Sequence, residues 1–295
     1  MKILNFGSMN LDYVYSVPHF VQPGETLSAT HRSICFGGKG LNQSIALARA
    51  GVQVFHGGCV GAGGESLCSL LRENGVDVSL LASVQEMQGH TVIQVNPQGE
   101  NCILLFGGSN RCVTESQILS TLASFSPGDW LVLQNEISGL EILLREAHRK
   151  GMVTVLNPSP FEDSIRSLDL GNLSWMLVNE IEVAQLTGTS DPEAAFSILH
   201  TQYPGLSLLV TLGSHGSVAF RQTPKGTEIA KEDALSVKCV DTTGAGDTYT
   251  GYFLAGLIQG LSLQESMHQA SLAAAISVTR PGAADSIPWR KECGF

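Results

Sequence analysis

The chain has 295 residues, of which 43% are hydrophobic and 15% are charged. It is therefore long enough to bury a large core, and nothing in its composition is typical of a disordered protein. Its 17 Lys and Arg residues against 27 Asp and Glu residues give a formal net charge of −10, and no basic patch of the kind that binds duplex nucleic acid stands out.

The seven cysteines are odd in number and lack C-x-x-C spacing. This argues against a disulfide scaffold or a zinc site, and we expect buried free thiols instead. The first residues, 1–7, are too few and too polar for a signal peptide, and no apolar run approaches the length of a membrane span. We therefore expect a soluble, cytoplasmic protein with neither a nucleic acid nor a membrane as its partner.

The first predicted element is a buried strand at 2–7, a short apolar run that ends in Gly7. Asn10 and Asp12 follow at once, at the carboxyl end of a strand, where open α/β sheets bind their ligands. The start of the chain thus carries a first pair of candidate ligand-binding groups.

Two kinds of predicted element follow up to residue 106. Strands are predicted at 27–36, 52–56, 90–95 and 101–106, and helices at 41–50 and 65–74. The last two strands flank a Pro- and Gly-containing turn at 96–100, which predicts a hairpin. A hairpin does not fit a simple alternation of strand and helix, so we expect this hairpin, together with 11–16 and 27–36, to form a small separate sheet.

After residue 110 strands and helices alternate regularly. Helices are predicted at 115–124, 139–150, 180–187 and 192–201, and strands at 130–134, 152–156, 175–178 and 207–212. Two or three short strands are expected between 216 and 239, and two long helices rich in Ala and Leu at 245–259 and 263–279. This order predicts one domain over 1–295 with a mostly parallel sheet covered by helices on both faces.

The stretch DTTGAGDT at 241–248 opens the first of these long helices. Glycines at a helix start allow several backbone N–H groups to point at one anion, and the helix dipole favours negative charge there. An aspartate at that place would repel a phosphate, but it can accept the proton of a hydroxyl that attacks one. Asp247 is therefore either a catalytic base or simply a helix cap, and these eight residues alone do not decide.

A second glycine-rich stretch, GGKGLN at 37–42, lacks the spacing of a Walker A loop. Lys39 and Asn42 offer donors suited to sugar hydroxyls, although a plain turn with a surface lysine would have the same sequence. Asn10 and Asp12 occupy alternate positions and can point the same way, which suits vicinal hydroxyls, unless they form an ordinary Asx turn.

The remaining candidates lie after two later strands. Asn179 and Glu182 fall on one helical face and could place a phosphate or a Mg²⁺-bound water, or they could be the usual acidic first turn of a helix. The turn TLGSHG at 211–216 could hold a nucleotide. His215 in that turn receives no catalytic role.

Together, FGGKGLNQ at 36–43, VDTTGAGDTYTG at 240–251, NLD at 10–12 and NEIE at 179–182 resemble the ribokinase (PfkB) family of carbohydrate kinases. The resemblance runs from about residue 2 to about residue 290. It implies a ribokinase-like three-layer α/β/α sandwich with a small β lid, formed by about 11–36 and 88–108, that closes over the sugar and often makes a dimer interface.

The resemblance also implies the reaction. The family transfers the γ-phosphoryl group of ATP to a primary hydroxyl of a sugar or nucleoside with the help of Mg²⁺, and ribokinase-like members also bind a monovalent cation, usually K⁺. We expect D-ribose to be converted to D-ribose 5-phosphate by a cytoplasmic homodimer that forms through the lid. The alternatives are a kinase of fructose, a related ketose or a nucleoside, and a non-catalytic sugar or nucleotide sensor on the same fold.

Site residues follow from the same resemblance. Asp247 matches the catalytic base, and Gly244, Ala245 and Gly246 match the anion hole. The positions that match the sugar site are Asn10, Asp12, Gly38, Lys39, Asn42, Glu136 and Asp247. Those that match the nucleotide site are Asn179, Thr211, Gly213, Ser214, Gly216, Gly246 and Ser271. Glu182 matches an acidic position that organises Mg²⁺ and phosphate, and the cation site corresponds to Asp241, Thr243, Ser277, Arg280, Gly282 and Ser286.

Three residues depart from the family pattern. His90 stands where a small apolar residue near the sugar is expected, and it either donates to a sugar hydroxyl or faces solvent. Tyr13 is larger than in some members, and Ser271 replaces a histidine on the adenine side. These departures concern which sugar is bound rather than the type of reaction.

Overall fold

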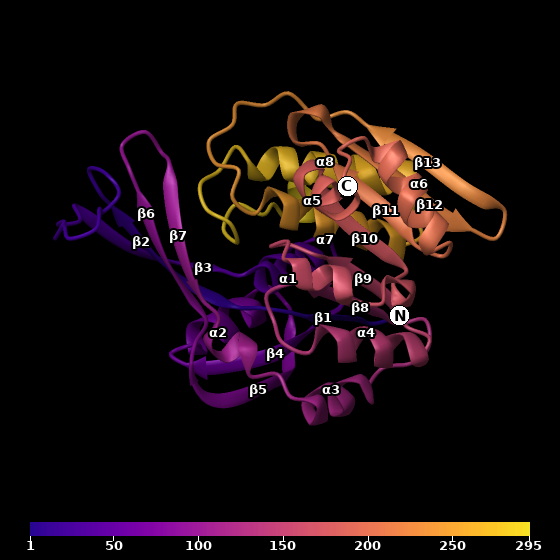
Figure 1. The fold of residues 1–295 in the computed structure, drawn as a ribbon, viewed down its shortest axis with the longest axis horizontal. Helices are drawn as coiled ribbons and strands as arrows, with labels where there is room; N and C mark the ends of the chain where they lie inside the picture. The colour runs from indigo at the N-terminus through magenta and orange to yellow at the C-terminus, as the bar shows by residue number, and fades with distance from the viewer.

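The computed structural model describes residues 1–295, and its largest element is a nine-stranded sheet (Figure 1). The strand order is β13-β12-β11-β10-β9-β8-β1-β4-β5, and every neighbouring pair from β11 to β5 is parallel, whereas β12 and β13 are antiparallel. The strands are β1 (Ile3–Phe6), β4 (Val54–Ala62), β5 (Asp77–Met87), β8 (Trp130–Gln134), β9 (Val153–Asn157), β10 (Trp175–Asn179), β11 (Ser207–Thr211), β12 (Ser217–Thr223) and β13 (Gly226–Glu232). The predicted mostly parallel sheet is confirmed.

Helices cover both faces of this sheet because its central strands are apolar on both sides. One face packs on α1 (Lys39–Arg49), α2 (Glu65–Glu73), α7 (Ala245–Ile258) and α8 (Leu263–Ser277). The other packs on α3 (Glu115–Leu122), α4 (Leu140–Arg149), α5 (Glu180–Thr187) and α6 (Pro192–Gln202). Successive strand residues alternate between the two cores, as Ile3 and Leu4 do. The three-layer α/β/α architecture predicted from the sequence is therefore confirmed.

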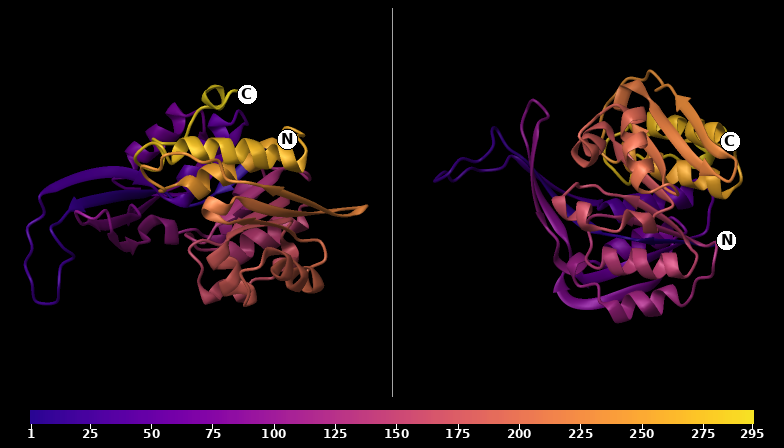
Figure 2. Two further views of the ribbon diagram at one scale, coloured as in Figure 1. Left: turned by 90° about the horizontal axis from the view of Figure 1, so that it is seen from above. Right: turned by 45° about the vertical axis from the view of Figure 1, so that its right-hand side comes forward.

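A second, four-stranded sheet projects from this body (Figure 2). Its order is β3-β2-β6-β7, with β2 (Asn10–Ser16), β3 (His31–Gly37), β6 (His90–Val95) and β7 (Asn101–Phe106). The hairpin β6–β7 has the predicted bounds, and β2 pairs in parallel with β6. We call these four strands the small sheet. All six residues of β7 are exposed, unlike any strand inside the main sheet.

Several local expectations were wrong. No strand was predicted at β5, although apolar residues at 78, 80, 82 and 84 alternate there with more exposed positions, and β3 begins at His31 rather than at residue 27. The expectation of buried thiols fails for Cys35, Cys102 and Cys239, which are exposed, the first two because they lie on β3 and β7, the mostly exposed edge strands of the small sheet. Short 3₁₀ helices lie at Gly108–Arg111, Asp163–Ser167, Leu170–Asn172, Gly213–His215 and Arg290–Cys293. None of the helices combines the length and the apolar character needed to cross a membrane.

Candidate active site

Two cavities meet at the carboxyl ends of the central strands, beside the start of α7. The first has a volume of about 260 Å³ and a mostly polar lining that includes Lys39, Asn179, Glu182 and Asp247. The second has about 520 Å³ and a more apolar lining. The residues common to both linings are Thr211, Thr242 and Gly246. The fold thus places a polar chamber and an apolar chamber side by side, at the edge where open α/β sheets bind ligands.

Asp247 lies in the first turn of α7 and is buried. Its Oδ2 accepts a hydrogen bond from Asn42 Nδ2 at 2.9 Å, and its Oδ1 accepts one from Gln43 Nε2 at 2.9 Å. The helix cap is Gly244, with no side-chain capping bond. The interpretation of Asp247 as a helix cap is therefore wrong, because its carboxylate is held from the side by two amides of α1.

The three residues before Asp247 form the helix start. Gly244 has a φ of +73°, and a Cβ there would lie 3.1 Å from Ala283 Cα, so both conformation and space favour glycine. Gly246 faces open space and lines both cavities. The N–H groups of Gly244 and Gly246 have no carbonyl partner and can donate to an anion at the junction of the two cavities, whereas the Ala245 N–H donates to Thr242 O at 3.2 Å.

Lys39 is half-buried and lines the polar cavity rather than extending into solvent. Burial lowers the pKa of the Lys39 ammonium, but the carboxylates of Asp247, Glu136 and Glu182 together raise that pKa above its ordinary value. Glu136 accepts from the Lys39 backbone N–H at 3.0 Å and from the Ser8 hydroxyl. One cation is therefore held among three carboxylates at this end of the site.

Asn10 and Asp12 lie two residues apart on β2, so their side chains share one face of the small sheet. Asp12 Oδ1 accepts from Thr91 Oγ1 at 2.6 Å, and Asn10 Oδ1 accepts from Asn110 Nδ2 at 2.7 Å. Burial, with a smaller contribution from Glu136, raises the pKa of Asp12 even though the Thr91 hydrogen bond opposes this shift. The Asx-turn interpretation is wrong, since both residues are in a strand.

Glycines leave room around this pair. A Cβ on Gly37 would lie 2.1 Å from Asp12 Oδ2, and a Cβ on Gly38, which has a φ of +95°, would lie 3.0 Å from backbone atoms of Ser8, Met9 and Asn10. The Gly37-Gly38 pair therefore lets β2 and the start of α1 approach each other closely.

The structure corrects the role considered for His90. In the register of the small sheet Thr91 pairs with Asp12, whereas His90 pairs with Leu11 and thus lies on the opposite face. The His90 ring lies between those of Tyr13 and Phe106, at centroid distances of 5.9 and 5.1 Å. Thr91, not His90, is the residue of β6 that reaches the Asp12 side.

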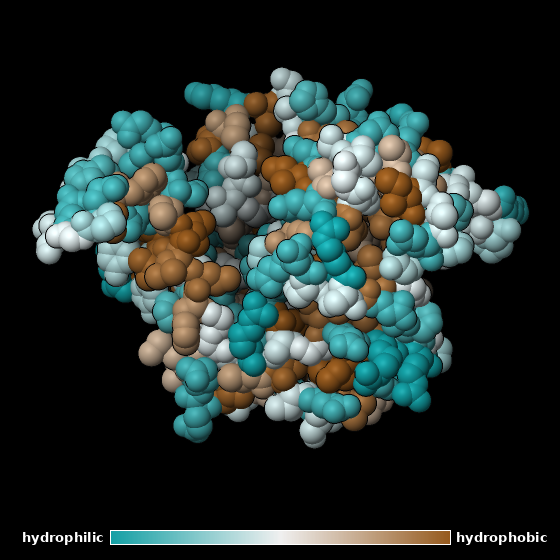
Figure 3. Space-filling view, in the orientation of Figure 1, coloured by the Kyte–Doolittle hydropathy of each residue, from teal (hydrophilic) through white to brown (hydrophobic).

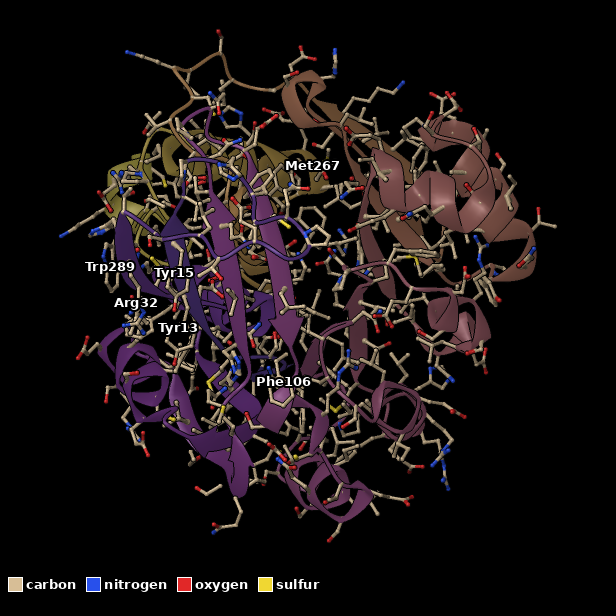
Figure 4. The ribbon with its side chains drawn as sticks, turned by 60° about the vertical axis from the view of Figure 1, so that its left-hand side comes forward. Tyr13, Tyr15, Arg32, Phe106, Met267 and Trp289 are labelled. Carbon is tan, nitrogen blue, oxygen red and sulfur yellow. The ribbon has the colours of Figure 1, made fainter.

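Tyr13 belongs to the same opposite face as His90. Figure 4 shows Tyr13, Tyr15 and Arg32 grouped on β2 and β3, and the Arg32 guanidinium lies 5.0 Å from the centre of the Tyr13 ring. The size of Tyr13 therefore does not bear on the space beside Asp12.

Asn179 and Glu182 form a capping box at the start of α5. Asn179 Oδ1 accepts from Glu182 N at 2.8 Å, and Glu182 Oε2 accepts from Asn179 N at 3.1 Å. Both residues also line the polar cavity. The interpretation as a helix start is therefore confirmed, and the ligand-binding role of the pair stays a prediction.

The residues predicted for the nucleotide side line the apolar cavity: Thr211, Gly213, Ser214, Gly216, Gly246 and Ser271. Only Asn179 of that set lies in the polar cavity alone. His215 is exposed and lines neither cavity, in keeping with its lack of an assigned role.

Asp241 joins two segments of the expected cation site. Its Oδ1 accepts from the backbone N–H and the hydroxyl of Thr243 at 2.9 and 2.6 Å, and its Oδ2 accepts from Gly282 N at 2.9 Å. Burial opposes ionisation, but these hydrogen bonds lower the pKa of Asp241 overall. The Arg280 guanidinium is paired with Glu292 at 2.9 Å and has no lone pair to offer, so only the backbone carbonyl of Arg280 could bind a cation.

The hydroxyls of Ser277 and Ser286 donate to nearby carbonyls and keep oxygen lone pairs available. The donors at this place are oxygen atoms, which are the ligands that hard cations prefer. Elsewhere in the structure, no group of three or more His, Cys, Asp or Glu side chains could hold a metal ion.

Sequence reasoning missed four polar residues of the site: Gln43, Thr91, Asn110 and Asn157. Gln43 had a local signal, because it follows Asn42 in the glycine-rich stretch at the start of α1. The other three come from segments without a motif, and only the fold brings them to the site.

Comparison with known proteins agrees with this geometry. The pattern of the family described as pfkB family carbohydrate kinase matches residues 1–290. The ribokinase of Haemophilus influenzae is 36% identical over 300 residues, which cover 97% of this chain and 95% of the relative.

Two solved structures are similar over the whole chain. The crystal structure of ribokinase from Cryptococcus neoformans var. grubii serotype A in complex with ADP has a TM-score of 0.87 and 33% identity, and the match covers 99% of this chain and 98% of that one. The structure of Arabidopsis thaliana ribokinase complexed with ribose and ATP has a TM-score of 0.86 and 28% identity, with coverages of 99% and 96%.

Proposed function

The chain belongs to the pfkB family of carbohydrate kinases and is a sugar kinase, and we propose that it converts D-ribose and ATP to D-ribose 5-phosphate and ADP. The observation that carries this proposal is the position of Asp247, a buried carboxylate at a glycine-rich helix start that lines the polar cavity, next to the residue Gly246 that both cavities share. The similar ribokinases bound to ribose and ATP, or to ADP, support these substrates.

Asp247 acts as the general base. The primary hydroxyl oxygen of the sugar forms a bond to the γ-phosphorus while the bond from that phosphorus to the bridging oxygen of ADP breaks, and the hydroxyl proton goes to Asp247. The N–H groups of the Gly244–Gly246 turn stabilise the negative charge of the transferring group. The charged Lys39 adds a second source of stabilisation at the same cavity.

The sugar site consists of Asn10, Asp12, Gly38, Lys39, Asn42, Glu136 and Asp247. Carboxylates at Asp12 and Glu136 suit a ligand rich in hydroxyl donors. Asn42 Oδ1 is buried without a partner, and a sugar hydroxyl would supply the missing donor. Thr91 donates a hydrogen bond to one oxygen of Asp12 and therefore leaves this carboxylate fewer lone pairs for hydrogen bonds from sugar hydroxyls.

The nucleotide site lies along the apolar cavity. The residues assigned to it are Asn179, Thr211, Gly213, Ser214, Gly216, Gly246 and Ser271. Apolar lining residues such as Leu235 and Val237 suit a purine ring. Glu182, at the polar end, would organise Mg²⁺ through its water shell, and the ion would neutralise charge on the phosphates.

A K⁺ ion would be held by the segment of Asp241 and Thr243 together with Ser277, Arg280, Gly282 and Ser286, largely through oxygen atoms. When bound, it would supply positive charge that shapes the anion-binding turn of Gly244–Gly246. Activity measured in Na⁺ or Tris should fall and recover with K⁺. Equal activity in all three buffers would remove the cation from the proposal.

The small sheet is proposed to act as a lid on a single kinase domain over residues 1–295. Figure 3 shows apolar atoms on the small sheet beside the hollow that separates it from the body. Ile103 and Leu105 lie on the Asp12 face, and Leu104 and Phe106 lie exposed on the other face. The first face would exclude water from the sugar, and the second would pair with another copy in a homodimer. We place the enzyme in the cytoplasm, where ATP is available.

The substrate is tested by measuring ADP release with a panel of pentoses, ketohexoses and nucleosides. The proposal predicts the highest kcat/KM with D-ribose. A higher value with fructose, another ketose or a nucleoside would replace ribose but keep the kinase. Absence of turnover with every acceptor would instead favour a sugar or nucleotide sensor.

A further inference from the structure

A chain of buried side-chain amides runs through the body of the protein and ends at Asp247. Asn5, Gln134 and Gln43 are fully buried and come from β1, β8 and α1. The hydrogen bonds run from Asn5 Nδ2 to Gly40 O at 2.7 Å, Gln134 Nε2 to Asn5 Oδ1 at 2.8 Å, Gln134 Nε2 to Gln43 Oε1 at 2.7 Å and Gln43 Nε2 to Asp247 Oδ1 at 2.9 Å. The proposed chemistry makes no use of these hydrogen bonds, apart from the one that Gln43 donates to Asp247.

The direction of every amide in the chain follows from its first bond. A backbone carbonyl can only accept, so the Asn5 nitrogen must face Gly40 and its oxygen must face Gln134. Gln134 must then present its nitrogen to Asn5, and the same nitrogen contacts the oxygen of Gln43. The Gln43 nitrogen is left facing Asp247. Because each amide fixes the orientation of the next, the Gln43 N–H must point at the Asp247 carboxylate.

A second anchor reaches Gln43 independently. Asn157 Nδ2 donates to Leu177 O at 2.8 Å, which again can only accept, so Asn157 Oδ1 faces Gln43. The Gln43 nitrogen lies 3.3 Å from that oxygen. Both neighbours of Gln43 therefore impose the same orientation, with the shorter contact on the Gln134 side.

A reversed Gln43 amide would be strongly disfavoured. Its oxygen would face the Asp247 carboxylate, and its nitrogen would face the Gln134 nitrogen, in a region without solvent. Gln134 cannot follow such a reversal, because its nitrogen also donates to Asn5 Oδ1 at 2.8 Å, and a reversed Gln134 would place two amide oxygens against each other.

We propose that Gln43 is a positioning residue for Asp247, and that Gln134 and Asn5 fix the direction of its amide. The donor on Asp247 Oδ1 holds the carboxylate in one orientation while the remaining lone pairs receive the sugar hydroxyl. This inference rests on the proposed function of Asp247 as the base. It adds that the base is positioned by residues that lie between the sheet and α1 and have no assigned contact with either substrate.

The test is the variant Gln134→Met, which keeps the side-chain volume and removes both hydrogen bonds to its neighbours. We expect kcat to fall about tenfold or more while KM for ATP and KM for sugar stay within about twofold, because the lost interaction acts on the transition state only. Gln43→Met removes the donor itself and should lower kcat by at least as much.

Two variants control for a purely structural effect. Gln269→Met removes a buried amide that donates to Tyr252 O at 3.1 Å and has no part in the series of amides that leads to Asp247. Ser44→Ala removes the branch in which Ser44 joins Asn5 to His56, but it leaves the Gly40 anchor intact. Both should lower the thermal unfolding temperature and leave kcat unchanged.

The outcomes separate this inference from the function on which it rests. A folded Gln134→Met protein with wild-type kcat, or an equal loss of kcat in Gln269→Met, would overturn the positioning role. If Asp247→Asn also kept wild-type kcat, the base assignment itself would be wrong. Should Gln134→Met fail to fold, a neutron structure of the wild-type protein decides: deuterons on the Gln43 nitrogen must point at Asp247, and an oxygen there would refute the inference.

Discussion

The two carboxylates on either side of the proposed sugar site sit in very different surroundings. Asp247 lies in the body, where both of its oxygens accept from buried amides of α1. Asp12 lies on the small sheet, where one oxygen accepts from Thr91 and the neighbouring strand β7 is exposed along its whole length. Asp247, the proposed base, is thus held in place by the packed body. Asp12, which is proposed to select the sugar, lies on a sheet that can change without disturbing the core.

This contrast predicts that changes in the body alter the rate and changes on the small sheet alter the choice of substrate. The largest expected effect is that of Asp247→Asn, which removes the base but keeps the size of the side chain. We expect kcat to fall by roughly 10²–10⁴-fold, measured by ADP release. The unfolding temperature, followed in parallel, must show a folded protein, and a loss explained by unfolding alone would contradict the prediction.

The second prediction concerns the stability of the body. Burial lowers the pKa of His56 from an ordinary 6.5 to about 4, so the unfolded chain binds this proton first as the pH falls. The contribution of His56 to stability is complete above pH 6.5 and is lost as the pH falls toward 4, by about 3 kcal/mol at most.

Urea unfolding at pH 7 and at pH 4.5 measures this loss. Replacing His56 by Phe should weaken the dependence on pH, with the exposed His215→Phe as the matched control. An unchanged difference between the two pH values would show that other groups are responsible.

Much of the body was predictable from the sequence, and the reasons are local. Strands such as β8 are continuous apolar runs, and helices such as α7 and α8 are long and uninterrupted, so their bounds could be read within a few residues. β5 was missed although Val78, Leu80, Ala82 and Val84 alternate with more exposed positions, a pattern typical of a half-buried strand. The face of His90 depended on pairing register, and a shift of one residue reverses the faces of a strand.

The same distinction between local sequence patterns and long-range contacts applies to the site. Residues in glycine-rich motifs were found because glycine marks turns that approach ligands. Gln134 and Asn157 were missed, because their importance comes only from neighbours far away in the chain.

The third prediction is that Asp12→Asn weakens sugar binding and leaves the fold intact. The uncharged amide accepts hydroxyl donors less strongly, so KM for the sugar should rise roughly tenfold, as for loss of a charged hydrogen bond. KM for ATP should not change. Because burial raises the pKa of Asp12, the variant also removes a charge that the folded state disfavours, and the unfolding temperature should not decrease. A rise in both KM values would contradict the separation of the two regions.

The pH dependence of KM for the sugar in the wild-type enzyme is a further test of the role of Asp12. The charged form of Asp12 binds the sugar, so KM for the sugar should rise as the pH falls through the raised pKa of this group. Thr91→Val removes the opposing hydrogen bond and should move that rise to higher pH. The rise should not move in His90→Gln, because His90 lies on the other face.

The smallest expected effect on the folded protomer is that of Leu104→Asp, on the exposed face of β7. A charge there should prevent pairing of two small sheets, so light scattering should show a monomer where the wild type is a dimer. The stability of the protomer should change by no more than about 0.5 kcal/mol. A wild-type protein that is monomeric at micromolar concentration would remove the proposed dimer.

Rapid-quench measurement of a single turnover isolates the step in which Asp247 is proposed to act as the general base. Enzyme in excess is mixed with limiting ATP and D-ribose, and sugar phosphate is counted against time, so that slow product release cannot hide the chemical step. If Asp247 is the base, transfer is fast in the wild type and is slowed by at least about 100-fold in Asp247→Asn. Equal rates of transfer in the two proteins would show that Asp247 is not the base.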